Sequence, residues 1–370
     1  MKVMTVFGTR PEAIKMCPLI LELKKHKDID CRVCLTGQHR EMLQQVMKAF
    51  QITEDYNLDI MKTGQSLTAI TIGVLEKMES VLKSERPDLI LVHGDTTTSY
   101  AAALAAFYQQ IPVGHVEAGL RTGNIYSPFP EEMNRLMTGR LATLHFAPTE
   151  RNRLNLLNEN VTEHVYVTGN TVIDAFKVTV KEGYKYCNRQ LRETDFDNRK
   201  VILVTAHRRE NIGVPLQNIC DALKQLVQEH EDIQIVYPVH PNPAVKDTVY
   251  TILGDTDRIL LTDPIDVLDM HNLIAHSYMV MTDSGGLQEE APSFGKPVLV
   301  MRTETERPEA VEAGTVKVVG VERDNIYREA KRLLADEGAY TQMARAVNPY
   351  GDGHASERIV GHIFEFWHSK

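Results

Sequence analysis

The sequence predicts an α/β protein with two doubly wound domains, each containing a parallel sheet. Short runs of apolar and β-branched residues alternate with amphipathic helical patterns, which is typical of parallel strands joined by right-handed crossovers. This alternation fades into polar and charged residues between positions 177 and 200 and then starts again. The chain has 370 residues, more than one compact core usually holds, so we expect the polar interval to separate two domains.

The first domain is expected to cover residues 1–172 and to begin with a strand, a turn and a helix. Pro11 suits the first turn of that helix because its φ is fixed and it lacks an N–H, whereas Pro18 is expected to kink the helix. Residues 89–92 are apolar on both faces, as in a parallel strand covered by helices on both sides. The other strands are expected at 3–7, 31–35, 113–116 and 144–147, and further helices at 41–50, 67–82 and 97–108.

The second domain is expected to cover residues 173–355, and a last helix within 356–370 is expected to pack back on the first domain. Strands are expected at 201–205, 233–238, 259–262, 279–281 and 298–301, and helices at 216–230, 267–276, 287–294 and 325–335. In open α/β sheets, ligands bind beyond the carboxyl ends of the strands. The cleft that the two domains face is therefore the expected position of the active site.

Composition and charge exclude several classes of protein. Hydrophobic residues make up 43% and charged residues 25% of the chain, which excludes collagen-like, disordered and disulfide-scaffold proteins. The 41 basic and 50 acidic side chains give a net charge of −9, so we expect no binding to nucleic acid or to a membrane surface. We expect neither a membrane span nor a secretory leader, and five cysteines, an odd number, fit reduced thiols. We expect a cytoplasmic protein.

The turn after the first strand, Gly-Thr-Arg-Pro-Glu at 8–12, places basic residues near a helix N-terminus. Arg10 and Lys15 could both face a phosphate there, since helix N-termini and guanidinium groups bind anions. A solvated Arg and Lys beside a turn is the alternative. The chain contains neither a P-loop nor a GxGxxG dinucleotide fingerprint, so we expect no nucleotide cofactor such as NAD.

Three carboxylates follow neighbouring strands of the first domain. Asp95 follows the strand at 89–92, Glu117 closes the next strand, and Glu131 stands on a loop that leads into a helix. Simpler roles are a helix cap for Asp95 and a first-turn carboxylate for Glu131. If the three converge at one sheet edge, their crowding raises their proton affinities and suits them to acid and base catalysis.

The second domain carries two polar turns at the same kind of position. His207 follows the first strand of that domain, and Ser284, Gly285 and Gly286 stand between a strand and a helix, where bare N–H groups can hold a diphosphate. Glu290 could accept from ribose hydroxyls. Arg302 and Arg307 follow the next strand and could close on the diphosphate. No sequence motif for a metal site is present, and the 14 histidines are scattered.

Six motifs in order resemble the non-hydrolysing UDP-N-acetylglucosamine 2-epimerases. They are GTRPEAIK at 8–15, HGD at 93–95, GHVEAGLR at 114–121, PEEMNR at 130–135, TAHRREN at 205–211 and DSGGLQEE at 283–290. The resemblance implies two Rossmann-like domains in the glycosyltransferase-B architecture, reversible conversion of UDP-GlcNAc to UDP-ManNAc, and a product used for cell-surface polysaccharide. It also implies a homodimer.

The same resemblance assigns roles to individual residues. It implies catalytic roles for Asp95, Glu117, Glu131 and His207. It implies contacts with the UDP-sugar for Arg10, Lys15, Arg135, Ser284, Gly285, Gly286, Glu290 and Arg307. An activating second molecule of UDP-GlcNAc would be lined by Gln38, His39, Arg40, Arg208 and His240. Where some relatives have Gln and Phe near the uracil, this chain has Ile265 and Met270.

The chemistry of C2 inversion agrees with these residues. The C2–H bond of a saturated sugar is not acidic, but expulsion of UDP gives C1 cation character, and a carboxylate can then take the C2 proton to form 2-acetamidoglucal. Return of UDP with protonation on the other face gives the epimer, and the route needs acid and base groups and a held leaving group. A hydrolysing epimerase, a glycosyltransferase of the same fold and a non-catalytic nucleotide-sugar sensor are the alternatives.

Overall fold

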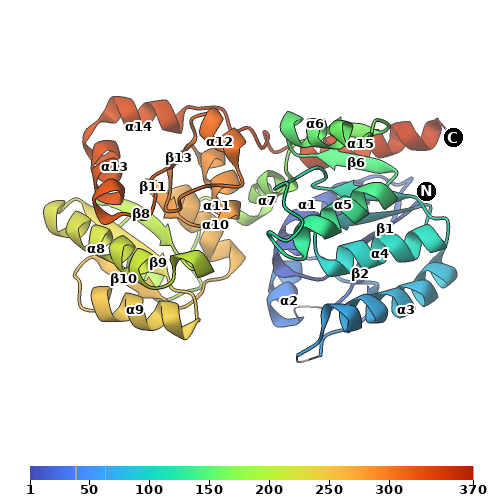
Figure 1. Ribbon diagram of the computed structural model, residues 1–370, viewed down its shortest axis with the longest axis horizontal. Helices are drawn as coiled ribbons and strands as arrows, with labels where there is room; N and C mark the ends of the chain where they lie inside the picture. The colour runs from blue at the N-terminus through green and yellow to red at the C-terminus, as the bar shows by residue number, and fades with distance from the viewer. Residues whose placement is uncertain (38–39, 63, 370) are drawn as a thin grey trace. The chain divides into compact units, whose positions relative to one another are not determined.

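The computed structural model describes residues 1–37, 40–62 and 64–369, and no side chains are described for 40–42. The chain forms two compact units, drawn in Figure 1. The first contains Met1–Val178 and Tyr350–Lys370, and the second contains Thr179–Pro349. No helix among the described residues is long and apolar enough to cross a membrane.

The first unit is built on a parallel sheet in the order β3-β2-β1-β4-β5-β6-β7. Its strands are β1 (Lys2–Phe7), β2 (Asp30–Leu35), β3 (Tyr56–Asn57), β4 (Leu89–His93), β5 (Val113–Val116), β6 (Leu144–Ala147) and β7 (Val165–Val167). The order reverses between β1 and β4, which pair in parallel register from Val3↔Leu89 to Val6↔Val92. This reversal is the switch point at which open α/β sheets bind ligands.

Helices connect these strands and bury their apolar sides against the sheet. They are α1 (Arg10–Lys25), α2 (Arg40–Ala49), α3 (Leu67–Glu85), α4 (Thr97–Tyr108), α5 (Glu131–Leu141), α6 (Glu150–Asn158), α7 (Thr171–Thr179) and α15 (Ala355–His368). All five residues of β4 are buried, and Val74 and Met78 of α3 pack with Ile90 and Val92 in one apolar cluster. Helix α4 is rich in alanine, and five of its alanines are buried.

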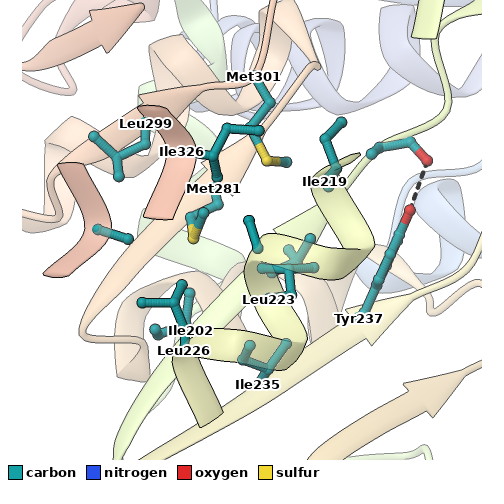
Figure 2. Close-up of a cluster of buried hydrophobic side chains, with 14 of the residues drawn as sticks. Ile202, Ile219, Leu223, Leu226, Ile235, Tyr237, Met281, Leu299, Met301 and Ile326 are labelled. Carbon is teal, nitrogen blue, oxygen red and sulfur yellow. Dashed lines mark hydrogen bonds between the residues drawn. The ribbon is translucent and has the colours of Figure 1, made fainter. Parts of the chain in front are cut away.

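The second unit repeats this design with the sheet order β10-β9-β8-β11-β12-β13. Its strands are β8 (Lys200–Thr205), β9 (Ile233–Pro238), β10 (Ile259–Thr262), β11 (Met279–Thr282), β12 (Val298–Val300) and β13 (Val316–Val318). Its helices are α8 (Val214–Glu229), α9 (Pro243–Leu253), α10 (Val267–His276), α11 (Gly285–Glu290), α12 (Pro308–Glu312), α13 (Arg323–Ala335) and α14 (Glu337–Ala344). Figure 2 shows part of its core, where Leu223 of α8 lies among Ile202, Ile235 and Met281 of the sheet.

One polar contact in this core also fixes a loop. The Tyr237 hydroxyl is buried and donates to the Ala206 carbonyl at 2.8 Å, drawn as the dashed line in Figure 2. Ala206 directly precedes His207, so the core of the second unit anchors the loop that carries this histidine.

The chain passes between the units twice, after Val178 and after Pro349. The first crossing lies near the end of α7, beyond the expected boundary at 172. The second lies before α15, which packs on α1 within the first unit. Asp174 of α7 fixes the start of α15, because its carboxylate accepts from the backbone N–H groups of Ala355 at 3.2 Å and Ser356 at 2.8 Å.

The predicted fold class, α/β with two doubly wound units, is confirmed. The helix expected at 287–294 is a short α11 followed by a 3-10 turn over Ala291–Phe294, which contains Pro292. Helix α1 continues through Pro18 to Lys25. The sequence did not predict three short strands, β3, β7 and β13, because two or three residues are too few for a periodic pattern. It also did not predict the helices α6, α7, α9, α12 and α14.

Candidate active site

The first candidate residues lie in the loops after β1 and β4, at the switch point. Thr9 and Glu12 form a capping box at the start of α1, in which Glu12 Oε2 accepts from the N–H groups of Gly8 at 2.9 Å and Thr9 at 2.7 Å. Glu12 Oε1 accepts from the hydroxyls of Thr96 and Ser99, each at 2.7 Å. This buried carboxylate therefore joins the turn that presents Arg10 to the loop that presents Asp95.

Glu117 lies at the centre of a buried polar cluster. It directly follows β5 and has a left-handed backbone with φ of 62°. Its Oε2 forms an ion pair with Lys15 of α1 and accepts from Asn170 Nδ2 at 3.0 Å. His93 Nε2 lies 3.7 Å from the same oxygen. The cluster thus fixes one carboxylate with a cation, an amide and an imidazole from three other segments.

His93, the last residue of β4, is an uncharged member of this cluster. Burial lowers its pKa, although the negative charge of Glu117 opposes that effect. Its Nε2 has no hydrogen-bond partner among the described residues. The imidazole next to Glu117 is thus neutral, and Lys15 is a cation that pairs with this carboxylate.

Asp95 is held by Arg135 of α5. Nε and Nη2 of Arg135 contact Asp95 Oδ2 at 2.9 and 2.6 Å, and Nη1 contacts Glu132 at 2.9 Å. Asn134 Nδ2 donates to the Asp95 carbonyl at 2.9 Å. Arg135 and Glu132 are both buried, so α5 orients Asp95 through a rigid network.

Glu131 is the first residue of α5, four positions before Arg135, so it lies on the helix side that holds Asp95. Its Oε2 is buried and has no hydrogen-bond partner among the described residues. Glu117 lies close to the loop that carries Asp95, since a Cβ at Gly94, the residue before Asp95, would lie 3.8 Å from Glu117 Oε1. From the sequence we expected carboxylates crowded against one another. In the structure Asp95 and Glu117 are each paired with a cation.

In the second unit, His207 lies between an aspartate and a second histidine. Its Nδ1 is 3.4 Å from Oδ1 of the fully buried Asp283. Its ring stacks on that of His240, with centroids 5.2 Å apart and planes 6° apart. Burial lowers the pKa of His207, whereas the Asp283 charge raises it.

Two guanidinium groups flank Gly285 at the start of α11. A Cβ at Gly285 would lie 3.7 Å from Arg307 Nη2 and 3.8 Å from Arg208 Nη2. Arg307 also forms an ion pair with the buried Glu289, which orients it, and Arg208 Nε donates to the Asp283 carbonyl at 3.3 Å. The arrangement concentrates positive charge beside a residue with no side chain, which suits an anionic group.

Three of the remaining predicted residues of this unit belong to α11 or cap it. Ser284 N–H donates to Thr282 Oγ1 at 2.9 Å, and a Cβ at Gly286 would lie 3.2 Å from Glu290 Oε1. Glu290 Oε2 lies 3.7 Å from Nε2 of the buried His271. Arg302, by contrast, pairs with Glu210 at 3.0 Å and Glu306 at 3.5 Å.

Three further groups of predicted residues are placed as follows. Ile265 is buried before α10, and Met270 is half-buried within it. Gln38 and His39 lie outside the described residues, and Arg40 begins α2. Arg208 and His240, the other two residues of the expected activating site, both lie near His207 in the second unit.

The described residues hold one group of side chains with the spacing of metal ligands: Cys187, Asp266 and Asp269. Asp269 already accepts from the Tyr184 hydroxyl at 2.9 Å and from the N–H groups of Cys187 at 2.8 Å and Asn188 at 2.7 Å. The hydrogen bonds from the turn at 184–188 therefore explain the position of the Asp269 carboxylate without a metal ion.

Several residues of these clusters have no role that the sequence motifs predict. Glu12 could have been found from the Thr-x-x-Glu capping box, a sequence signal in its own right. Asn170 lies outside the six motifs, and Asp283 lies in one of them without an assigned role, because each acts through contacts with residues more than 50 positions away.

A family model described as UDP-N-acetylglucosamine 2-epimerase matches residues 21–364. A UDP-N-acetylglucosamine 2-epimerase of Bacillus subtilis (strain 168) is 57% identical over 361 residues, covering 97% of this chain and 94% of its own length. A crystal structure of UDP-GlcNAc 2-epimerase from Neisseria meningitidis bound to UDP-GlcNAc has a TM-score of 0.89 and 50% identity and covers 99% of this chain and 100% of its own. The glycotransferase of kitacinnamycin, 12% identical with a TM-score of 0.65 over 98% of both chains, shares the fold alone.

Proposed function

The chain belongs to the UDP-N-acetylglucosamine 2-epimerase family, and we propose that it inverts C2 of UDP-GlcNAc reversibly without hydrolysis. UDP leaves C1, a carboxylate removes the C2 proton, and 2-acetamidoglucal forms while UDP stays bound. UDP then adds back as a proton arrives on the opposite face, which gives UDP-ManNAc. The observation that carries this proposal is the cluster around Glu117, a carboxylate held in a strained backbone position by Lys15 and Asn170.

Glu117 is the residue that we assign to C2 proton transfer. Ion pairing with Lys15 favours its charged form, which is the form a base needs, and Asn170 holds one of its oxygens in place. Glu131 is assigned to proton transfer on the other face because its Oε2 is buried and has no hydrogen-bond partner among the described residues. Asp95, oriented by Arg135, is the third acid–base residue of the proposal.

The second unit is assigned the UDP leaving group. Negative charge develops on the diphosphate as the C1–O bond breaks, and guanidinium groups placed beforehand stabilise that charge. Arg208 and Arg307 beside Gly285 supply them, and Ser284 and Gly286 at the start of α11 are assigned to the same diphosphate. In this proposal Arg10 of the first unit, at the N-terminus of α1, adds a cation, and Glu290 accepts from the ribose.

Three other properties belong to this proposal. We propose a homodimer, with support from a largely apolar hollow of about 370 Å³ lined mainly by residues of α4 and α5. Activation by UDP-GlcNAc is proposed near Arg208 and His240. We also propose that the enzyme is cytoplasmic, which fits five cysteines that are all free thiols. Its product would supply polysaccharide precursors.

An NMR time course with UDP-GlcNAc separates this function from its alternatives. The proposal predicts UDP-ManNAc at equilibrium with UDP-GlcNAc and no accumulation of free sugar. Release of ManNAc and UDP would identify a hydrolysing epimerase, and turnover only with an added acceptor would identify a glycosyltransferase. Binding with no turnover would identify a sensor. A lag with pure UDP-ManNAc that a trace of UDP-GlcNAc removes would support the activating site.

A further inference from the structure

We propose that Asp283 is the positioning residue of His207: its carboxylate holds the imidazole with Nδ1 protonated, so that Nε2 is the nitrogen offered to the substrate. The inference rests on the proposed function, because His207 takes part in the chemistry only if the chain acts on UDP-sugars. The structure supplies the geometry that carries it.

The two oxygens of Asp283 have different surroundings. Oδ2 accepts from the N–H groups of His207 and Arg208, each at 2.8 Å, and from Asn211 Nδ2 at 3.0 Å. Oδ1 is buried and has no hydrogen bond among the described residues, but His207 Nδ1 faces it at 3.4 Å. Oδ2 therefore holds the loop, and Oδ1 is left to act on the imidazole.

A carboxylate that served the loop alone would not need this second contact. Asp283 is fully buried, and a buried carboxylate oxygen without a donor costs free energy. An N–H on Nδ1 of His207 places a donor 3.4 Å from that oxygen and so lowers this cost. Stacking on His240 fixes the ring plane through a second contact. The imidazole is thus held by contacts from two different loops.

The charges around His207 support the same assignment. Burial, and then His240 and Arg208, lower the pKa of His207, whereas Asp283 and Glu210 raise it. Asp283 is the buried one of these two anions, so it is less screened by solvent. Asp283 therefore stabilises the imidazolium that would form if His207 takes up a proton during turnover, as in other His–Asp pairs.

Asp283→Asn tests the proposal because it removes the charge but keeps an oxygen for the loop. The amide oxygen can still accept from the N–H groups of His207 and Arg208, while the amide nitrogen faces Nδ1 as a donor and favours the wrong tautomer. We expect kcat to fall about 10²-fold or more while KM changes little. The limb of the pH–rate profile due to His207 should move to lower pH, because the anion that raises its pKa is gone.

Asn211→Ala is the matched control. It removes the hydrogen bonds from Asn211 to Asp283 Oδ2 and to the Met301 carbonyl, both 3.0 Å, and it leaves the Asp283 charge in place. We expect lower thermal stability with an unshifted pH profile. In a His207→Gln background, Asp283→Asn should cause no further loss of kcat. If Asp283→Asn matches the unmodified enzyme in kcat and pH profile, the proposal is wrong although epimerisation stands.

A second measurement reads the unmodified chain directly, and a variant is used only to assign one signal. ¹⁵N NMR of the histidine-labelled, unmodified chain reports the tautomer of His207 directly, with the signal assigned from the spectrum of His207→Gln. We expect the hydrogen on Nδ1, and a hydrogen on Nε2 of the neutral ring would overturn the proposal. Absence of epimerisation by the unmodified chain would instead refute the proposed function.

Discussion

Lys15 forms an ion pair with Glu117, although the two residues are 102 positions apart and were assigned different tasks from the sequence. We expected Lys15 to face a phosphate and Glu117 to act on the sugar. Their contact means that the charge of the carboxylate is matched within the first unit. A change at Glu117 therefore also changes the surroundings of Lys15.

Glu117→Gln should lower turnover about 10²- to 10⁴-fold, the usual scale for loss of a general acid or base. UDP affinity should change little, because the residues assigned to UDP lie mainly in the second unit. Initial rates by coupled assay and UDP affinity by calorimetry check both parts. Glu150→Gln, at an exposed carboxylate of α6, is the control and should be neutral. Near-normal turnover of the Glu117 variant would remove this residue from the mechanism.

Asn170→Asp should move the pH dependence of catalysis. Asn170 Nδ2 donates to Glu117 Oε2 at 3.0 Å, and an aspartate there would set a second carboxylate against the first. Like charges raise the pKa of a carboxyl group, so the limb due to the base should shift to higher pH. The pH dependence of kcat/KM measures the shift. An unshifted limb would show that Glu117 is not the group that this profile reports.

Gly285→Ala should weaken UDP binding without unfolding the second unit. The new methyl group would lie 3.7 Å or more from both guanidinium groups, which is ordinary contact, and Gly285 is the first residue of a helix. It would occupy the space beside Arg208 and Arg307 that we assign to the diphosphate. We expect Kd for UDP to rise roughly tenfold, about 1.4 kcal/mol, by calorimetry with Tm unchanged or higher.

Gly361→Ala is the control for that variant. A Cβ at Gly361 meets no atom within 4 Å, and the residue lies in the middle of α15. It should stabilise the fold by up to about 1 kcal/mol through helix propensity and leave UDP affinity unchanged. Equal UDP affinity of the Gly285 variant and this control would exclude an anion site at α11.

Two buried histidines should make the protein less stable in mild acid. Burial lowers the pKa of His115 to about 3 and that of His145 to about 4. Between pH 6.5 and about 4 the unfolded chain binds protons at these positions and the folded chain does not, so the free energy of unfolding falls as the pH is lowered. His145→Gln should give a smaller slope of stability against pH in urea titrations. An unchanged slope would show that His145 does not titrate between these states.

The positions of the candidate residues could be predicted because they follow strands. Asp95, Glu117 and His207 each stand within a few residues of a strand's carboxyl end, where this fold places its chemistry. Their partners could not be predicted in this way. Asn170 reaches Glu117 from the turn before α7, and Asp283 reaches His207 from the loop after β11. These contacts depend on strand order, which a local pattern does not encode.

The backbone conformation of Glu117 also could not be predicted from a local sequence pattern. Glu117 has φ of 62°, a region that favours glycine, although its sequence signal was that of an ordinary strand end. The strain is tolerated because Lys15 and Asn170 hold the side chain. Periodicity indicates where β5 ends, and the tertiary contacts of the loop decide how the next residue is turned.

Isotope transfer in the epimerisation itself tests the central claim most directly. The reaction is run in D₂O on UDP-GlcNAc with ¹⁸O in the bridge between C1 and the β-phosphate, and the recovered UDP-sugars are analysed by NMR. Elimination and re-addition predict deuterium at C2 of UDP-ManNAc and movement of ¹⁸O into non-bridging positions of the β-phosphate. UDP-ManNAc that keeps the original hydrogen at C2 and an unscrambled bridging oxygen would contradict the mechanism, even with epimerisation confirmed.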